Sequence, residues 1–363
     1  MSDEPHLNPG LPSFESHPFA SLTPEAVLDA VSALGVDVDG RFYALSSYEN
    51  RVYELCVNDD SQSVIAKFYR PHRWSREQIQ EEHDFAAELM AADVPMVGPL
   101  SLRSSTLHEV RLPKLQSDEV TQHDPSGSGT ETFYMSLSPK RGGRWPELDD
   151  PDVLAWLGRL LARIHQVGER QAFAVRPRLD AQSFGWEPRR WLLEEFNLPY
   201  ECREEWAQVS EVALQEVEAA MDCGVNTLRL HGDFHPGNIL WTPSGPQTPG
   251  GPHFVDLDDA RMGPAVQDLW MLLSGERADQ TFGLSCILEG YESLREFDRR
   301  ELALIEPLRT LRLIHYSAWL AQRMADPAFV RAFDWFGTPN YWRDQIVVLK
   351  DQSERMKAPP LVV

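Results

Sequence analysis

The sequence contains little cysteine and no long hydrophobic run, and both absences narrow the kinds of protein that it can encode. Its four cysteines, Cys56, Cys202, Cys223 and Cys286, are scattered and form no CxxC pair. We therefore expect reduced thiols in a cytoplasmic protein, and neither a disulfide framework nor a zinc site. No apolar stretch approaches the ~18 residues of a membrane-spanning helix. The N-terminus lacks the basic start and apolar stretch of a signal peptide.

Positive charge is also scarce. The chain has 34 Lys and Arg against 56 Asp and Glu, which gives a net charge of −22. A sequence-independent grip on nucleic acid needs Lys and Arg on the phosphates, so we expect no nucleic-acid partner and no anionic membrane partner. The acidic surface is compatible with cationic substrates or with simple solubility. Apolar residues make up 42% of the 363 residues, which is enough for a core and for two lobes in a monomer.

The stretch from residue 228 to residue 261 predicts a hairpin with acidic residues at both ends. A short apolar run at 239–241 is followed by turn residues at 242–252, and a second strand returns over 253–255. Asp233 and Asn238 precede the first strand, and Asp256 follows the second. Because a hairpin brings the outer ends of its strands together, we expect these three side chains to converge.

An Asp, an Asn and a second Asp in this arrangement favour metal-assisted phosphoryl transfer. Hard oxygen ligands suit Mg²⁺, which typically takes one or two carboxylates together with substrate phosphates. In kinase catalytic loops one Asp accepts the proton of the substrate hydroxyl, and an Asn five residues later and an Asp on the next hairpin bind metal. Asp233, Asn238 and Asp256 have that spacing. A solvated turn would explain any one of them alone, but not the whole pattern.

The string His-Gly-Asp-Phe-His-Pro-Gly-Asn, from His231 to Asn238, resembles the catalytic loop of the aminoglycoside phosphotransferase and choline kinase superfamily. The resemblance implies an α+β, two-lobed protein-kinase-like fold, with a small β-rich N-lobe and a larger helical C-lobe. Protein kinases read His-Arg-Asp where this chain reads His-Gly-Asp. We expect a flexible N-terminal tail over residues 1–20 and an N-lobe over 21–137. A hinge over 138–143, which meets the adenine, would lead to a C-lobe over 144–363.

The residues before the hairpin predict the ATP-binding elements. Three strands are expected over 41–70, and the turn after the first lies where kinases cover the ATP phosphates with a glycine-rich loop. This turn has no glycine, so backbone N–H groups and the hydroxyls of Ser46 and Ser47 would cradle the phosphates. A plain polar hairpin tip is the alternative. The strand Val-Ile-Ala-Lys-Phe, which contains Lys67, resembles the kinase strand whose Lys pairs with the phosphates.

Lys67 needs an acidic partner, because an unpaired charge in an apolar strand is costly. The next helix, predicted over 76–90, offers Glu81, Glu82 and Glu88. Glu82 aligns best when we count back from the point where the superfamily resumes its next strand. Glu81 is the alternative, since one residue turns the helix face by about 100°.

Two residues are expected to support the catalytic loop and not to act directly in the reaction. His231 opens the loop, and Asp268 follows a Gly-Pro break at the start of a helix. The superfamily carries an Asp here whose carboxylate steadies the catalytic loop from behind. The alternative is an Asp that favours the helix dipole, and both can be true.

Several other elements are predicted from periodicity and turn residues. We expect a helix that starts at Thr23 and Pro24, a strand pair over 96–110, and an insertion at a hairpin tip over 113–132. A further helix is expected from Asp150 and Pro151 to Gly168, and Gly158 within it permits close contact with another helix. We also expect a loop around Phe184-Gly-Trp. Three- and four-residue steps place a stripe of side chains on one face of a late helix, namely Arg309, Arg312, Tyr316, Trp319 and Arg323. This stripe either lines the substrate end of the cleft or is ordinary packing.

A narrower resemblance covers nearly the whole chain. The segments 46–53, 66–71, 141–144, 256–261, 263–275 and 335–337 look like those of the bacterial stress response kinase A family, serine/threonine protein kinases on the small-molecule-kinase fold. By this resemblance Asp233 is the catalytic base, Asn238 and Asp256 bind Mg²⁺, and Ser47 contacts ATP. Lys67 would lie on the ATP phosphates, oriented by Glu82. The acceptors would be Ser and Thr hydroxyls of protein substrates.

Two other functions remain open. A small-molecule kinase for an aminoglycoside, homoserine or a choline-like amine is favoured by Asp258 and Asp259 near the predicted site. A non-catalytic nucleotide-binding scaffold is disfavoured by the intact set of catalytic and ligand residues, which are Lys67, Asp233, Asn238 and Asp256. The chain lacks a long activation segment with an Ala-Pro-Glu string, so we expect no control by loop phosphorylation.

Overall fold

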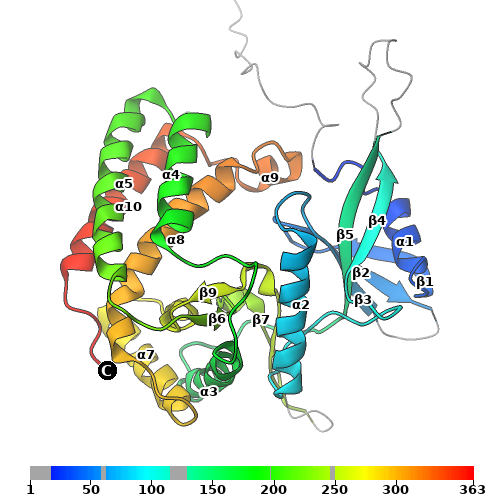
Figure 1. Ribbon diagram of the computed structural model, residues 1–363, viewed down its shortest axis with the longest axis horizontal. Coiled ribbons are helices and arrows are strands. Elements are labelled where there is room, and N and C mark those ends of the chain that lie inside the picture. Colours follow the sequence, from blue (N-terminus) through cyan, green and yellow to red (C-terminus); the bar gives the residue numbers. More distant parts are fainter. Residues whose placement is uncertain (1–17, 59–62, 115–128, 197, 246–249) are drawn as a thin grey trace, which may run out of the picture. The chain divides into compact units, whose positions relative to one another are not determined.

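The computed structural model describes residues 18–58, 63–114, 129–196, 198–245 and 250–363 (Figure 1). These residues form two compact units, which are described separately here. Unit 1 comprises Met1–Ser75, Leu100–Lys140 and Gln322–Asp334, and unit 2 comprises Arg76–Pro99, Arg141–Ala321 and Trp335–Val363. The division follows contacts within each unit, and the lobe boundaries expected from the sequence stay a prediction.

Unit 1 is built on one antiparallel sheet of five strands in the order β1-β2-β3-β5-β4. Helix α1 begins as predicted, with Pro24 in its first turn and the Thr23 hydroxyl accepting the Ala26 N–H at 3.2 Å. Buried side chains of the sheet, such as Leu55 and Phe68, form the core of the unit. Its elements are α1 (Pro24–Ser32), β1 (Val38–Ala44), β2 (Arg51–Val57), β3 (Ser63–Phe68), β4 (His108–Pro113), β5 (Thr130–Pro139) and α9 (Pro327–Ala332).

The predicted strand pair over 96–110 is wrong. In its place, Leu102 and Ser105 form an isolated bridge around a tight turn, and β4 begins only at His108. Arg103 and Ser104 have φ values of 49° and 65°, a left-handed backbone that cannot continue a strand. The predicted insertion follows β4, and Pro113 pairs with Thr130 at its base. Most of that insertion, residues 115–128, lies outside the described residues.

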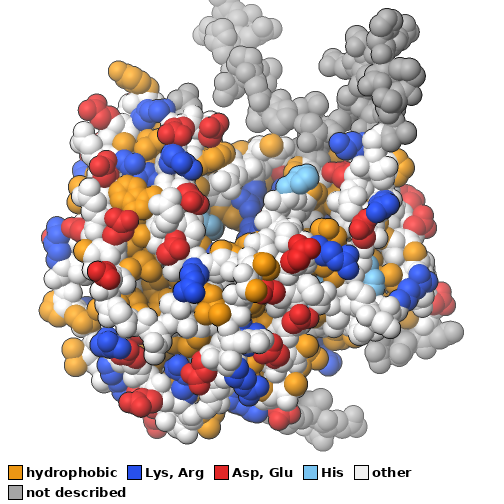
Figure 2. Space-filling view, viewed as in Figure 1, with side chains coloured by type: hydrophobic (Ala, Val, Ile, Leu, Met, Phe, Trp, Pro, Cys, Tyr) orange, Lys and Arg blue, Asp and Glu red, His pale blue; other side chains and the backbone are white. Residues whose placement is uncertain are grey.

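Unit 2 is mainly helical and carries two small antiparallel ribbons, β6 with β9 and β7 with β8. Its strands are β6 (Leu228–Leu230), β7 (Ile239–Thr242), β8 (Gly251–Phe254) and β9 (Arg261–Gly263). Its α-helices are α2 (Arg76–Ala91), α3 (Pro151–Gly168), α4 (Glu187–Trp191), α5 (Tyr200–Met221), α6 (Val266–Trp270), α7 (Arg277–Glu292), α8 (Ile305–Ala321) and α10 (Pro339–Lys357). On the face of unit 2 seen in Figure 2, acidic and basic side chains are interspersed, so the negative charge is not gathered into one patch there.

Helices α3 and α7 pack closely through glycine. A Cβ on Gly158 of α3 would lie 2.0 Å from the carbonyl oxygen of Ile287 in α7. A Cβ on Gly290 of α7 would lie 1.9 Å from the carbonyl oxygen of Ala155 in α3. Both positions therefore exclude any side chain, which agrees with the close helix contact predicted at Gly158. Helix α3 begins and ends where the sequence predicted, and the Asp150 carboxylate accepts the Asp152 N–H.

The loop expected around Phe184 is helical, which corrects that prediction. Residues Gln182–Trp186 form a π-helical turn that continues into α4. Gly185 within it lies where a Cβ would be 2.3 Å from Leu214 of α5 and 2.9 Å from Leu311 of α8. Packing against two helices therefore decides this conformation, and the local sequence does not. Within the described ranges, no helix is both long enough and apolar enough to cross a membrane.

Candidate active site

The predicted hairpin forms, and it brings the acidic ends of the segment together. Strands β7 and β8 pair from Ile239 with Phe254 to Thr242 with Gly251. Asn238 directly precedes β7, and its carbonyl oxygen accepts the Val255 N–H at 3.1 Å. Asp256 is the next residue, so it follows β8 beside the loop that carries Asn238. The hairpin tip, residues 246–249, lies outside the described residues.

Glycine is required in the His-Gly-Asp string. Gly232 has a φ of +86°, and a Cβ on it would lie 2.1 Å from the carbonyl oxygen of Asp259. The loop therefore passes too close to the segment after Asp256 to accept a side chain. An arginine, as protein kinases carry at this position, would not fit.

Asp268 holds this loop from behind. Its carboxylate is fully buried and accepts the backbone N–H groups of His231 and Gly232, both at 2.9 Å. The His165 ring lies on the other side, with Nε2 at 3.2 Å from Asp268 Oδ2 and Nδ1 at 2.9 Å from the Tyr291 hydroxyl. These contacts are of the kind expected for a supporting Asp268, and they place His165 in a structural role.

His231 joins the two halves of the hairpin region. Its ring is buried, its Nε2 lies 3.0 Å from the carbonyl oxygen of Val255, and it packs edge-on against Phe234. Val255 precedes Asp256, so the His231 side chain links the loop of Asp233 to the backbone that positions Asp256. We find the geometry of a supporting residue, and its importance for activity stays a prediction.

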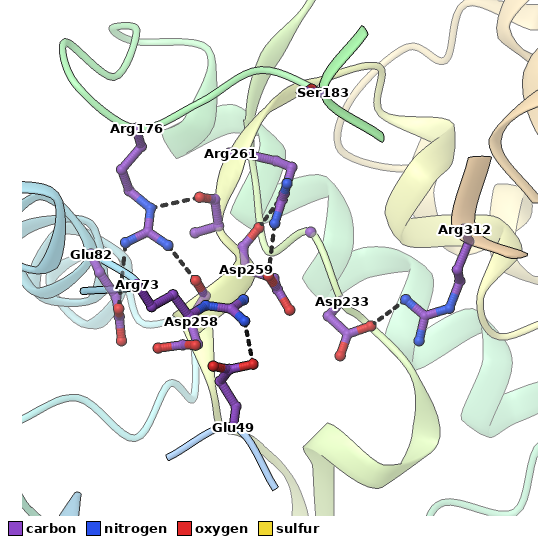
Figure 3. Close-up of polar contacts among 12 residues, drawn as sticks. Glu49, Arg73, Glu82, Arg176, Ser183, Asp233, Asp258, Asp259, Arg261 and Arg312 are labelled. Atoms are coloured by element: carbon purple, nitrogen blue, oxygen red, sulfur yellow. Dashed lines mark hydrogen bonds and ion pairs between the residues drawn. The ribbon is translucent and has the colours of Figure 1, made fainter. Parts of the chain in front are cut away.

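Asp233 has polar contacts with side chains from other parts of unit 2, and Figure 3 shows Arg312 extending toward it. Its Oδ1 accepts a hydrogen bond from Arg312 Nη1 at 2.7 Å, and its Oδ2 lies 3.3 Å from His235 Nε2. The Asn238 amide donates to the Asp233 carbonyl oxygen at 2.9 Å. Burial by itself would raise the pKa of Asp233, but the hydrogen bond from His235 and the charge of Arg312 outweigh it and hold that pKa well below its usual range. Asp233 is therefore a carboxylate at neutral pH.

Asp256 has a left-handed backbone, with φ 66° and ψ 72°. This conformation is rare for residues other than glycine, costs about 1–3 kcal/mol and clusters at functional sites. A metal ion would fit the donor set of Asp256 and Asn238. Because Asn238 directs its Nδ2 to Asp233, its oxygen remains for a ligand, and one carboxylate with one amide oxygen suits Mg²⁺.

A buried arginine ties the segment after Asp256 to helix α2. The guanidinium of Arg176 donates to the carbonyl oxygens of Asp258, Ala260 at 2.6 Å and Gln78 at 2.9 Å. Its Nη1 also lies 3.5 Å from Glu82 Oε2, as Figure 3 shows. Sequence reasoning missed Arg176, because no motif marks an arginine whose partners are mainly carbonyl groups.

The three acidic candidates on α2 have different surroundings. Glu81 accepts the backbone N–H groups of residues 174–176 at 2.6–3.0 Å. Glu88 pairs with Arg229 at 2.6 Å. Glu82 is 5% exposed and lies beside Arg176. Lys67 belongs to unit 1, so its pairing with Glu82 is not tested and stays a prediction.

In unit 1, Lys67 lies in β3 opposite Val52 and Ser136, and its ammonium group lies 4.8 Å from the centre of the Tyr69 ring. Ser46 and Ser47 lie on the loop between β1 and β2, where Ser46 is exposed and Ser47 is half-buried. The structure therefore places these residues on the elements that the sequence predicted for them.

An arginine whose side chain is 11% exposed stabilises this glycine-free loop. Arg70 donates to the carbonyl oxygens of Tyr48 at 3.0 Å and Glu49 at 2.9 Å, and its backbone N–H donates to the Asn50 side chain at 3.0 Å. Burial lowers the pKa of Arg70. The loop thus has a defined conformation in place of the flexibility that glycine would give. Sequence reasoning did not identify Arg70.

A late segment of the chain, Gln322–Asp334, packs on the same loop. Arg323 pairs with Glu49, and Asp326 pairs with Arg51. The Tyr48 ring lies against Phe329 and Phe333, with ring centres 6.0 and 4.9 Å away. Arg323 was predicted to continue the stripe of α8, but it lies beyond the end of that helix and contacts this loop instead.

The rest of that stripe is mixed. Arg309 pairs with Glu306 at 2.7 Å, and Tyr316 stacks on Trp319. Arg312 contacts Asp233. One side chain of the stripe therefore reaches a predicted catalytic residue, and the other contacts fit ordinary packing.

The comparisons with known proteins agree with this architecture. The sequence pattern of the phosphotransferase enzyme family matches residues 43–305. Stress response kinase A of Salmonella choleraesuis (strain SC-B67) is 39% identical over 343 residues, which cover 94% of this chain and 96% of that protein. The values are the same for the serine/threonine protein kinase RdoA of Salmonella typhimurium (strain LT2), and stress response kinase A of Escherichia coli (strain K12) is 40% identical over the same shares.

Two solved structures show the same fold. Amicoumacin kinase hAmiN in complex with AMP-PNP, Ca²⁺ and Ami has a TM-score of 0.67 and 20% identity, covering 94% of this chain and 96% of that one. The microcompartment-associated aminopropanol kinase has a TM-score of 0.63 and 18% identity, covering 91% and 98%. The predicted two-lobed fold of the aminoglycoside phosphotransferase and choline kinase type is confirmed.

Proposed function

The chain belongs to the phosphotransferase enzyme family, and from this premise we propose that it is an ATP- and Mg²⁺-dependent serine/threonine protein kinase of the bacterial stress response. Relatives that are 39–40% identical over 94% of the chain carry the names stress response kinase A and serine/threonine protein kinase RdoA. The single observation that carries the proposal is the β7–β8 hairpin, in which Asn238 donates to the Asp233 carbonyl oxygen and accepts the N–H of Val255, the residue before Asp256.

The proposed roles follow from the position of each residue. Asp233 orients the acceptor hydroxyl and accepts its proton as the oxygen attacks the γ-phosphate of ATP. Asn238 and Asp256 hold Mg²⁺, which when bound neutralises charge on the transferring phosphoryl group. Asp268 and His231 keep the loop of Asp233 in place through the contacts described above.

The nucleotide is bound mainly by residues of unit 1 in this proposal. Lys67 contacts the phosphates, and Glu82 of α2 orients Lys67. Ser46 and Ser47 offer hydroxyls and backbone N–H groups on the loop that Arg70 stabilises. Most of the rate comes from positioning and from electrostatic stabilisation of the transferring group.

The test measures transfer of label from γ-labelled Mg-ATP to a mixture of Ser and Thr peptides. Asp233→Ala and Asp256→Ala should each lower the rate by roughly 10²–10⁴-fold, the usual range for a positioned general base or an electrostatic contact. Asp344→Ala is the matched control, because Asp344 is an exposed acid on α10. An Asp233→Ala protein as active as the control would refute the assignment of the base.

The same assay separates the two classes of acceptor. Labelled peptide that is lost with Asp233→Ala supports a protein kinase. ATP consumption with a small alcohol or amine, without labelled peptide, would replace it by a small-molecule kinase. The cytoplasmic location and the monomeric state expected from the sequence stay predictions.

A further inference from the structure

Arg312 of helix α8 differs from the other arginines around Asp233, because most of its donors have no partner within the described part of the chain. Its Nη1 donates to Asp233 Oδ1 at 2.7 Å, and its side chain is 41% exposed. Among the residues that the structure describes, Asp233 is its one hydrogen-bond or ion-pair partner. A guanidinium carries five N–H donors in a planar fork, so donors remain directly beside the proposed catalytic base.

Neighbouring arginines are engaged by the protein itself. Arg309, almost one turn earlier on α8, pairs with both carboxylate oxygens of Glu306 and lies over the Trp270 ring. Arg261 donates to Asp259 through its side chain and contacts the Phe184 ring. Figure 3 shows this difference, since Arg261 is folded against Asp259 whereas Arg312 extends toward Asp233.

Asp258, Asp259 and the acid of α8 are buried or paired, which leaves them unsuited to binding a cationic substrate. Asp258 is only 4% exposed, so its carboxylate is buried in the protein. The Asp259 carboxylate pairs with Arg261 at 2.7 Å. Glu306 is the one acidic residue of α8, and its carboxylate accepts hydrogen bonds from Arg309 and Gln352. The acids that favoured an amine substrate in the sequence are therefore buried or paired.

The exposed face of α8 around Arg312 fits an anion better than a cation. Residues three, four and seven positions later share its face, because these spacings bring side chains onto one side of a helix. They are His315, stacked on Phe184 with ring centres 4.1 Å apart, and the stacked pair of Tyr316 and Trp319. This face carries a guanidinium, an imidazole and aromatic rings, and no carboxylate.

We propose that Arg312 determines acceptor specificity by binding an anionic group next to the hydroxyl that Asp233 activates. The inference rests on the proposed protein kinase function and names its substrate class, a Ser or Thr flanked by an acidic side chain. A hydroxyl placed at Asp233 brings its neighbouring groups against the open N–H donors of Arg312. A carboxylate accepts them in bidentate geometry, whereas an ammonium group in the same place is repelled.

The experiment compares three peptides that differ only in the residues beside one Ser, which are Asp, Asn or Lys. The kcat/KM of the wild type should be at least about tenfold higher for the Asp peptide than for the Asn peptide, because one charge-assisted hydrogen bond contributes that much. It should be lowest for the Lys peptide. Arg312→Gln should abolish this ratio and leave the KM for ATP unchanged. Arg312→Lys should keep part of it, because the charge stays and the planar fork is lost.

Arg343→Gln is the control, because it removes the same charge from an exposed position on α10. It should keep the wild-type preference. Equal rates of the wild type for all three peptides, or a preference that persists in Arg312→Gln, would overturn the proposal. A uniform fall in kcat for all peptides with Arg312→Gln would do the same, since it would show only the loss of the Asp233 contact.

A second arm separates this inference from the proposed function. If no peptide is labelled, the protein kinase function fails, and ATP turnover is then compared with glycerate, an anionic alcohol, and with choline, a cationic one. Faster turnover with glycerate that depends on Arg312 would support anion binding from a small molecule. Faster turnover with choline would refute it.

Discussion

Replacing Asp268 should reduce stability and activity together, because one buried carboxylate holds the loop of Asp233. It is fully buried and accepts two backbone N–H groups, from His231 and Gly232, each at 2.9 Å. Asp268→Ala leaves both donors without a partner and removes the carboxylate beside His165. A hydrogen bond to a charged group contributes about 1.5–3 kcal/mol, and the two lost here share one acceptor and are not fully additive.

We therefore expect Asp268→Ala to lower the free energy of unfolding by about 3–5 kcal/mol, in the range found when one partner of a buried charged network is removed. Asp268→Asn should lower the free energy of unfolding less, because its amide keeps one acceptor oxygen. Some stability is still lost, because the NH₂ group of the amide faces the other backbone N–H. Urea unfolding gives the change in stability, and kcat is measured at a temperature where the variant is folded.

The kcat of the folded variant should fall at least about tenfold, because a loss of 1.4 kcal/mol in transition-state positioning has that effect. The control is Asp279→Asn, since the Asp279 carboxylate also accepts a backbone N–H, from Glu276 at 3.0 Å, but at an exposed helix start. Such a cap contributes about 1 kcal/mol and does not touch the site. An Asp268→Ala protein with wild-type kcat and a stability within 1 kcal/mol of the control would refute the reasoning.

Three further predictions test other parts of the chain. Burial raises the pKa of Glu301 from 4.5 to about 7, so the folded state favours the protonated carboxyl group. The protonated group therefore contributes to the free energy of unfolding fully below pH 4.5, and this contribution is lost as the pH rises through 7. Glu301→Gln should remove that dependence and gain about 3 kcal/mol at pH 8, and an unchanged pH slope in urea unfolding would contradict it. Gly158→Ala should lower the free energy of unfolding by about 3 kcal/mol, because its Cβ would lie 2.0 Å from a carbonyl oxygen of α7. Gly142→Ala is the control: a Cβ there has nothing within 4 Å, so the free energy of unfolding should not change in the same assay. Asp326→Asn weakens the contacts with Arg51 and Arg70 that hold loop 46–50. The KM for ATP should therefore rise roughly tenfold while the KM for the acceptor stays constant. Equal changes in both KM values would count against this role of Asp326.

The sequence by itself determined the features that depend on neighbouring residues. Thr23 and Asp150 predicted helix starts because a side-chain oxygen before a proline-led turn satisfies the first N–H groups. The hairpin that joins Asn238 to Asp256 followed from two short apolar runs around a turn-rich segment. Because these signals act between residues close in the sequence, they do not depend on how distant parts of the chain pack.

Local patterns misled where packing or backbone geometry overrode them. The strand pair expected over 96–110 is interrupted by left-handed residues at a tight turn. The segment around Phe184 becomes helical because Gly185 lets it pack closely against α5 and α8. Period and turn chemistry contain no information on such contacts, since the partners lie far away in the sequence.

Tertiary structure alone decided which charges meet. Arg312 reaches Asp233 across 79 residues, and Arg323 reaches Glu49 across 274. Arg176 joins α2 to the segment after Asp256 through carbonyl groups that any residue could supply. A charged side chain has no preferred partner along the chain, and its pairing is set by how helices and loops pack. The sequence therefore predicts the chemistry proposed for the site, and the packing of distant segments decided which side chains lie beside Asp233.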